Sequence, residues 1–402
     1  MNSSRIKPNI DSYIIGLYLF FTPLFLTNES RLLILFPSLF TIILLIKILS
    51  KRYISGNNKA LNSYFLFVVW CGVSHIWIGN LSYNFGGFAF LVLTLLSCFA
   101  ITKTKIKKID LTNILFIFCL SMIPAIYFNY ESLIKISTFN STTSIRRFSG
   151  TFGNSNSAAI YSISVIWSSL FLLTTSKISR TKQVILLIIA LISFQVIIIS
   201  GSRKGFIALF ILFVFQYFYL IKYLAKNIFI KILNITLLTI SAYYIFKYIS
   251  STIFYSRLEG LINGDKESYS DRAEILLESL DTWLNNPLLG VGFDSSRLYS
   301  SHNMPSHSSV METLASTGII GFILYFSIFL FLGISCFRIY KFSKKYKFIE
   351  LKKEVSYLII FLGFFLFFNF FAILYNSRLL WPFIFIVFSY LIQKKNLTSL
   401  IK

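Results

Sequence analysis

Apolar residues in this chain gather into long runs that short polar segments separate. A helix needs about 20 apolar residues to cross the hydrocarbon core of a bilayer. Runs of this kind lie near residues 12–27, 32–50, 61–79, 84–101, 110–128, 156–175, 183–200, 205–222, 228–249, 313–337, 354–374 and 379–393. The pattern therefore predicts an all-α integral membrane protein with about 12 transmembrane helices.

The composition excludes a water-soluble globule. The chain is 56% hydrophobic and only 13% charged, whereas a soluble domain carries about 25% charged residues. The four cysteines, Cys71, Cys98, Cys119 and Cys336, all fall in apolar runs, and we interpret them as small buried hydrophobic residues. Their spacing from the histidines is not that of a metal site, so we expect neither a metal nor a cofactor.

The positive charge of the chain indicates how it crosses the membrane. The formal net charge is +23. With the N-terminus in the cytoplasm, the cytoplasmic segments would hold 26 of the 38 Lys and Arg residues, and basic and non-basic loops alternate along the chain. We therefore predict a multi-pass protein of the cytoplasmic (inner) membrane with both termini inside. Because many short loops share the charge, a nucleic-acid partner is not expected.

The external loops differ greatly in length, and this difference divides the chain into three parts. Residues 1–249 would form transmembrane helices 1–9, residues 250–312 a large external loop between spans 9 and 10, and residues 313–402 transmembrane helices 10–12. A second external loop covers residues 129–153. Long loops without spans of their own tend to carry function, so we expect the 250–312 loop to handle a large external substrate.

The 250–312 loop contains one predicted amphipathic helix. Asp271 is its predicted N-cap, with Glu274 at the capping-box spacing, and Pro287 ends it. One face would carry Leu276, Leu280, Trp283 and Leu284. Such a helix lies on the membrane, closes over a cavity, or packs within a small external domain; the sequence leaves these alternatives open.

Three kinds of polar side chain gather at the predicted outer surface. Arg203 and Lys204 in "SGSRKGF" stand at the outer boundary of a span, where charges mark functional sites more often than not. The alternative is that both side chains only extend to the lipid headgroups. Arg272 opposes the dipole of its predicted helix, which favours a functional role over an ion pair with a neighbouring acid. His307 stands just before the span at 313–337 and can exchange a proton near neutral pH. The rim "RRFSGTFGNSNSAAIYS" (146–162) adds hydrogen-bonding groups, Arg146, Arg147 and Asn156 among them.

These groups predict the class of substrate. Guanidinium groups match phosphate oxygens, and an imidazole can take a proton from a hydroxyl. We therefore expect a phosphate-bearing lipid that is reached from outside and reacts with a hydroxyl group.

Three segments in this order, "SGSRKGF", "SDRAEILLESLDTWLNNPLLGVGF" and "HSSVMETLASTGIIG", resemble the O-antigen polymerase and ligase superfamily of bacterial membrane glycosyltransferases. The resemblance implies metal-independent transfer of a glycan from polyprenyl pyrophosphate, with inversion at the anomeric carbon. It assigns the catalytic roles to Arg203, Arg272 and His307. The family often has Asn after its histidine, where this chain has Ser308; His302, which Asn303 follows, is the alternative. The spacing to Gly318 and Gly321 favours His307.

Within this resemblance, "SGSRKGF" favours a polymerase of surface polysaccharide repeat units, either O-antigen or capsule. A ligase that passes the chain to lipid A core is the nearest alternative, and a transporter or flippase of the lipid-linked glycan is a further one. Predicted substrate-binding residues are Lys204, Arg146, Arg147, Asn156, His302, Glu312 and Arg378. Expected partners are the lipid-linked oligosaccharide and the bilayer, with a chain-length regulator and a flippase as further candidates.

Overall fold

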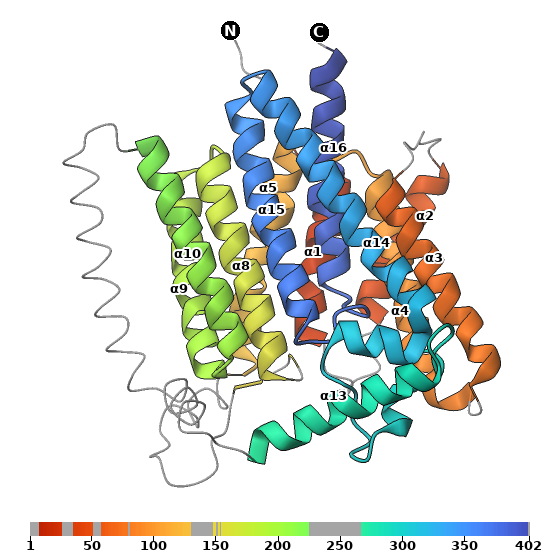
Figure 1. Cartoon of the computed structure of the whole chain (residues 1–402). Helices are drawn as coiled ribbons and strands as arrows, with labels where there is room; N and C mark the ends of the chain where they lie inside the picture. Colours follow the sequence, from red (N-terminus) through yellow and green to blue (C-terminus); the bar gives the residue numbers. More distant parts are fainter. Residues whose placement is uncertain are drawn as a thin grey trace, which may run out of the picture.

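The computed structural model describes residues 8–25, 35–50, 58–78, 81–129, 148–149, 152, 154–224 and 267–400. Regular structure in these ranges is helical, without a strand. The α-helices are α1 (Ile10–Phe21), α2 (Leu35–Ser50), α3 (Lys59–Val73), α4 (Leu81–Lys103), α5 (Lys108–Leu120), α6 (Met122–Tyr127), α8 (Ser155–Thr175), α9 (Arg180–Ser200), α10 (Arg203–Leu224), α13 (Glu267–Asn285), α14 (Ser309–Lys345), α15 (Ile349–Asn369) and α16 (Leu380–Leu400). Short 3-10 turns are η1 (Thr22–Phe25), η3 (Ser74–Trp77) and η5 (Ser296–Tyr299) (Figure 1).

The helices confirm the membrane-protein prediction. Six described segments are long and apolar enough to cross a bilayer: Lys59–Trp77, Gly86–Lys103, Lys108–Tyr127, Ser155–Thr175, Arg180–Ser200 and Ser309–Lys345. Shorter apolar helices cover Ile10–Phe21, Ser38–Lys47 and Leu380–Lys394. The predicted span at 228–249 lies outside the described residues, and the total of 12 spans stays a prediction.

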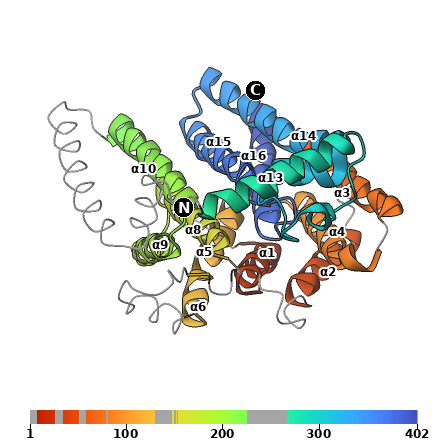
Figure 2. The same ribbon diagram turned by 60° about the horizontal axis from the view of Figure 1, so that its bottom comes forward.

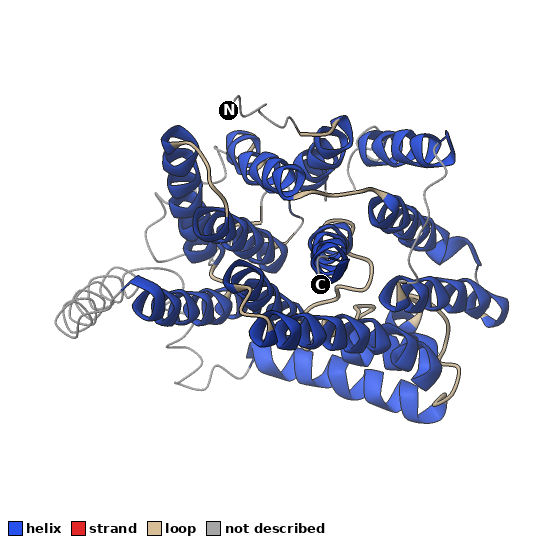
Figure 3. Ribbon diagram, turned by 90° about the horizontal axis from the view of Figure 1, so that it is seen from above, coloured by secondary structure: helices blue, strands red, loops and turns tan. Residues whose placement is uncertain are grey.

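Helix α16 lies in the middle of the bundle. Seen along the bundle, other helices surround it (Figure 3), and its residues from Leu380 to Leu391 are all buried. The ring of Trp381 stacks on Tyr64 of α3 with centroids 4.9 Å apart. A helix that is apolar on all sides belongs in a core, and this explains why α16 has no polar face in this stretch.

One end of the bundle, which we call the basic end, gathers the start of α1, the start of α5 and the end of α16. The backbone N–H of Asn9 donates to Asp110 Oδ1 at 2.7 Å. The side chain of Gln393 donates to the carbonyl of Thr104 at 3.1 Å. The first described helix thus begins, and the last one ends, on the same side of the bundle. This fits the prediction that the termini share one side; that this side faces the cytoplasm stays a prediction.

Helix α13 lies across the opposite end, which we call the α13 end (Figures 1 and 2). The helix begins at Glu267, so the prediction that Asp271 is its N-cap was wrong; polar residues extend it by one turn. It ends at Asn285, just before Pro287, as expected. Its buried residues include Ile275, Ser279 and Thr282, and it packs against α14.

The predicted apolar face of this helix is only partly inside. Leu276 and Leu284 are 40% and 60% exposed. The inner positions hold Ile275, Ser279 and Thr282, and the hydroxyls of the last two donate to carbonyls of α13 itself. The face that carries Leu276 and Leu284 is thus partly exposed, and its contact with the membrane or with a cavity stays a prediction.

Helix α14 breaks at Gly318, whose φ is 66° and ψ is −173°. The predicted span at 313–337 was too simple, because the chain bends inside it. A bend frees backbone groups that must find partners. The 287–292 segment supplies most of them: Val291 N–H donates to the Ala315 carbonyl at 3.0 Å, Gly292 N–H to the Ser316 carbonyl at 2.8 Å, and Ile319 N–H to the Pro287 carbonyl at 2.9 Å.

Two glycines make this junction possible. A Cβ atom on Gly318 would lie 2.1 Å from the Leu288 carbonyl oxygen, and one on Gly290 would lie 2.5 Å from the Gly318 nitrogen. Both residues also have positive φ, which side chains rarely allow. The indole N–H of Trp70 completes the junction by donating to the Thr317 carbonyl at 2.9 Å. The segments "NPLLGVG" and "STGIIG" are therefore two halves of one joint that fixes α13 to the bundle.

Candidate functional site

His307 occupies a strained turn directly before α14. Its φ is 55°, in the left-handed region, and the residue reaches the surface although neighbouring atoms partly cover its ring. The next residue, Ser308, caps α14, and its hydroxyl accepts from the Met311 N–H at 3.4 Å. Strain of this kind persists where the surroundings fix the backbone, and it clusters at functional sites.

The carboxyl group of Glu312 lies beneath this turn and is fully buried. It accepts hydrogen bonds from the Ser306 N–H at 3.1 Å and from the Ser306 hydroxyl at 3.0 Å. The hydroxyls of Ser296 and Ser316 donate to its other oxygen. Glu312 was expected among the substrate-binding residues; in the structure it holds the turn that carries His307 instead of reaching the surface.

Ser309 ties the same turn to the 370–379 connection between α15 and α16. Its hydroxyl donates to the Ala372 carbonyl at 2.8 Å and accepts from the Leu374 N–H at 2.8 Å. Its own N–H also donates to the Ala372 carbonyl, at 3.1 Å. The 370–379 connection is therefore a fixed support for the histidine turn.

Lys204 brings the start of α10 to this connection. Its ammonium donates to the Phe371 carbonyl and lies 5.5 Å from the centroid of the Phe371 ring. Gly201, with φ 57°, ends α9 in a left-handed turn, and α10 starts two residues later at Arg203. Arg203 is half-buried. The two cations of "SGSRKGF" thus stand in the first turn of a helix at the α13 end.

Asn156 anchors that helix start from α8. Its side-chain oxygen accepts from the Ser202 hydroxyl at 3.0 Å, and the Ser202 hydroxyl accepts from the Gly205 N–H at 3.4 Å. A Cβ atom on Gly205 would lie 2.6 Å from the Cβ of Ala159, so the first turns of α8 and α10 pack closely. Asn156, predicted to bind substrate, has its oxygen engaged in placing Arg203 and Lys204.

The electrostatics of His307 show which charged groups surround it. Partial burial lowers the pKa of His307 below its usual value, and the positive charges of Arg272 and Lys204 lower this pKa further. These cations come from α13 and α10, so the structure brings three predicted residues together from three separate segments. An imidazole with a lowered pKa is neutral at pH 7 and can accept a proton.

His302 has the opposite surroundings. It is exposed, and its Nε2 lies 3.5 Å from the carboxylate of Glu274 on α13. The neighbouring Ser301 N–H donates to Glu278 at 3.2 Å, and hydrogen bonds from Ser301 lower the pKa of Glu278. Carboxylates thus border His302 while cations border His307, and only the second setting suits a phosphate-bearing substrate.

Arg378 is a half-buried cation in the 370–379 connection. Its guanidinium carbon lies 3.3 Å from the centroid of the Phe90 ring on α4, and burial lowers its pKa to about 10. Within the described ranges no carboxylate lies within 4.0 Å of it. A stacked guanidinium without an acidic partner is suited to bind an anion.

Some predicted residues and groups lie elsewhere. Arg146 and Arg147 are outside the described residues. Among the residues that are described, no group of three or more His, Cys, Asp or Glu side chains is placed to hold a metal ion. Sequence reasoning did not select Ser306, Ser309 or Phe371, although the polar run "PSHSS" directly before an apolar span was a signal for the first two.

The comparison with protein families agrees with this geometry. The family model described as O-Antigen ligase matches residues 187–326. The matched range begins in α9 and includes Arg203, α13, His307 and the break at Gly318. No curated protein matches the chain in sequence. Residues 187–326 of the chain are thus similar to the O-antigen ligase family, and this match supports the resemblance to the O-antigen polymerase and ligase superfamily.

Proposed function

We propose that the chain polymerises repeat units of a surface polysaccharide, either O-antigen or capsule. The donor would be a glycan linked to polyprenyl pyrophosphate, and the acceptor a lipid-linked repeat unit at the outer face of the cytoplasmic membrane. The family match supports a lipid-linked glycan substrate in general terms. The proposal adds the direction of transfer, the independence from metal ions and, as candidate partners, a chain-length regulator and a flippase.

The convergence of a neutral imidazole with cations is the observation that carries this proposal. His307 has a lowered pKa because of burial, Arg272 and Lys204. Arg203 stands beside Lys204 in the first turn of α10. Cations that leave an adjacent base neutral are suited to a reaction in which an anion departs while a hydroxyl loses its proton.

The reaction can be written on these residues. An acceptor sugar hydroxyl attacks the anomeric carbon of the donor, and a new C–O bond forms with inversion. The bond from that carbon to the pyrophosphate oxygen breaks, and both its electrons leave with polyprenyl pyrophosphate. Arg203 and Arg272 stabilise the charge on this leaving group. His307 accepts the proton of the hydroxyl.

The second candidate is a ligase that transfers the finished chain to lipid A core. The description of the matching family, O-Antigen ligase, favours it, and the chemistry at the anomeric carbon is the same. The two differ in the acceptor alone. A strain without this protein separates them, because single-repeat side chains on the surface indicate a lost polymerase, whereas long lipid-linked chains that accumulate in the membrane indicate a lost ligase.

The orientation in the membrane can be tested independently. In a variant free of other cysteines, Ser268→Cys on α13 should react with a membrane-impermeant thiol reagent in intact cells with a permeabilised outer layer. Lys344→Cys near the end of α14 should not react. Labelling of position 344 without labelling of position 268 would place the proposed site in the cytoplasm and overturn the proposal.

A further inference from the structure

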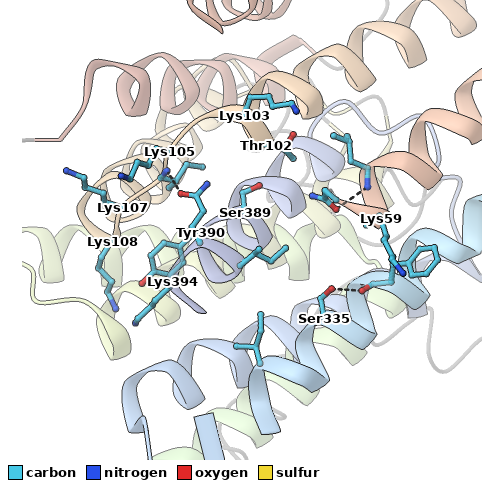
Figure 4. A pocket seen from close by; sticks show the side chains of 18 of the residues that line it. Lys59, Thr102, Lys103, Lys105, Lys107, Lys108, Ser335, Ser389, Tyr390 and Lys394 are labelled. Carbon is cyan, nitrogen blue, oxygen red and sulfur yellow. Dashed lines mark hydrogen bonds between the residues drawn. The ribbon is translucent and has the colours of Figure 1, made fainter. Parts of the chain in front are cut away.

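The basic end of the bundle contains a large cavity that the proposed reaction does not use. It has a volume of about 2000 Å³, whereas sites for small ligands measure about 300–1,000 Å³. Side chains of α3, α4, α5, α14 and α16 form its walls. Figure 4 shows lysines of several of these elements around the part of α16 that bears Ser389 and Tyr390.

The lining of this cavity is strongly positive. Eight basic side chains line it, and Glu350 is the only acidic side chain among the lining residues; the basic ones are Lys59, Lys103, Lys105, Lys107, Lys108, Lys177, Arg338 and Lys394. In the described part of the chain, ion pairs join two of these eight, Lys108 and Lys394, to a carboxylate, that of the buried Glu354. The remaining six outnumber Glu350, so the cavity keeps an excess of positive charge.

Below these cations the wall is apolar. It is formed by residues of three helices, namely Phe65, Leu95, Leu96, Phe99, Phe331 and Ile334. The ammonium of Lys103 lies 5.1 Å from the centroid of the Phe99 ring, and that of Lys59 lies 5.9 Å from the centroid of Phe331. Lysines that serve topology alone need only face water. Here the lysines border a cavity whose inner wall is formed by apolar side chains.

We propose that this cavity binds an anionic phospholipid of the adjacent leaflet. The lysines at its rim take the phosphate group, and the apolar wall takes acyl chain. Lysine is an ordinary partner of phosphate, and basic pockets between transmembrane helices bind anionic headgroups. A free phosphate compound shares the headgroup chemistry but would leave the apolar wall uncovered. The site lies at the opposite end of the bundle from His307 and is independent of the proposed reaction.

The test compares two triple variants of the full chain in detergent by native mass spectrometry, with phosphatidylglycerol as the probe. Lys103→Gln, Lys105→Gln and Lys107→Gln together remove three charges from the cavity. Lys341→Gln, Lys344→Gln and Lys345→Gln together remove three charges from the last turns of α14, which do not line it. We expect the cavity variant to bind the lipid at least about tenfold more weakly than the wild type, and the α14 variant to bind it normally. Equal weakening in both variants would show a general charge effect and overturn the proposal.

Two further measurements locate and identify the ligand. Ser335→Trp keeps every charge but fills the cavity next to Phe331, so it should reduce phosphatidylglycerol binding; unchanged binding would place the lipid elsewhere. Phosphatidylcholine should bind more weakly than phosphatidylglycerol, and equal binding would contradict a role for the lysines. Inorganic pyrophosphate should displace the lipid only in large excess. Displacement at equal concentration would show that the cavity takes a free phosphate compound and not a lipid.

Discussion

Two buried glutamates, one at each end of the bundle, are satisfied in opposite ways. Glu354 at the basic end and Glu312 at the α13 end are both 0% exposed. The carboxylate of Glu354 pairs with Lys108 and Lys394 and also accepts from the Tyr390 hydroxyl. Glu312 accepts from serine hydroxyls and from a backbone N–H. Cations hold the first carboxyl group, and neutral donors hold the second.

This difference bears on the charge balance at the two ends of the bundle. At the basic end, Glu354 neutralises part of the charge of Lys108 and Lys394, and these two ion pairs join α5, α15 and α16. At the α13 end, a carboxylate beside Arg272 or Lys204 would offset the charge that an anionic leaving group needs. The serines satisfy Glu312 with neutral donors, so that, among the described residues, its carboxyl group holds the His307 turn without an ion pair to Arg272 or Lys204.

The largest expected effect separates the two exposed histidines. His307→Ala should reduce polymer formation about 10²- to 10⁴-fold, because it removes the proton acceptor. His302→Ala is the matched control and should be milder, since carboxylates and not cations border that residue. The measurement is chain length and rate from purified lipid-linked repeat units, with protein levels compared by immunoblot. The opposite ranking would show that His302 is the working histidine.

Replacing the arginines with lysine should lower the rate by less than His307→Ala does. This loss depends on the planar shape of the guanidinium group, since lysine keeps the charge. Arg203→Lys and Arg272→Lys should each cost roughly 2–4 kcal/mol in the transition state, or about thirty- to a thousandfold in rate. A planar guanidinium makes two parallel hydrogen bonds to a pyrophosphate, which an ammonium cannot reproduce.

Arg297→Lys is the control for these variants, because Arg297 already pairs with Asp294. The same polymerisation assay, with a chelator present, measures all three. If lysine restores near-normal rates at positions 203 and 272, these residues do not clamp a pyrophosphate. Rescue by added divalent metal would show that another cation carries the leaving group.

Exchanging each buried glutamate for glutamine tests the comparison directly. Glu354→Gln should lower the free energy of unfolding by about 1–3 kcal/mol, less than for a fully buried ion pair, because the lysines are 34% and 25% exposed. Glu312→Gln should leave thermal stability closer to wild type and lower kcat about tenfold, since a single amide oxygen cannot serve all four donors and the His307 turn loosens. Thermal unfolding and kinetics on the same preparations decide this. A stability loss in Glu312→Gln as large as in Glu354→Gln, with kcat unchanged, would make Glu312 a purely structural residue.

The smallest expected effect concerns pH. Partial burial and, after it, the neighbouring cations lower the pKa of His307, so its imidazole stays neutral, and able to accept a proton, to a more acidic pH than usual. Activity should be lost as pH falls through this lowered pKa. Lys204→Gln removes one of the cations and should move the acid limb of kcat/KM to higher pH, by less than about one unit. Arg297→Gln should leave the limb in place; a shift of equal size there would point to a long-range effect of net charge.

Much of the fold could be predicted because its elements follow local patterns. Apolar runs revealed the six described segments that are long enough to cross a bilayer, and the amphipathic stretch revealed α13. The start of α13 was missed, because "ESYS" at 267–270 has no apolar periodicity. The break at Gly318 was hidden for another reason. It lies in a continuous apolar run, and the backbone groups that stabilise it belong to residues 287–292, a pairing that no local pattern reveals.

The candidate site could likewise be predicted only in part. The identities of His307, Arg272 and Arg203 came from short motifs and from the resemblance. The contacts that hold these three residues in place could not be predicted from motifs, because they join distant segments of the chain. The bond from Lys204 to the Phe371 carbonyl joins residues 167 positions apart. Glu312 was predicted to bind substrate, because no local pattern revealed its hydrogen bonds to Ser296, Ser306 and Ser316. Polarity alone marks a residue as interesting but cannot say whether it faces solvent.

The joint at Gly318 has a consequence for how such proteins diversify. The chain from Phe293 to Pro305 is fixed at one end by the joint and at the other by the bonds from Ser306 to Glu312. Between these ends, Leu298, Tyr299 and Met304 are 47%, 58% and 52% exposed. The exposed side chains of this stretch can therefore change while the bonds that hold the His307 turn stay in place, so that the outer surface of the α13 end and the position of His307 are free to change at different rates.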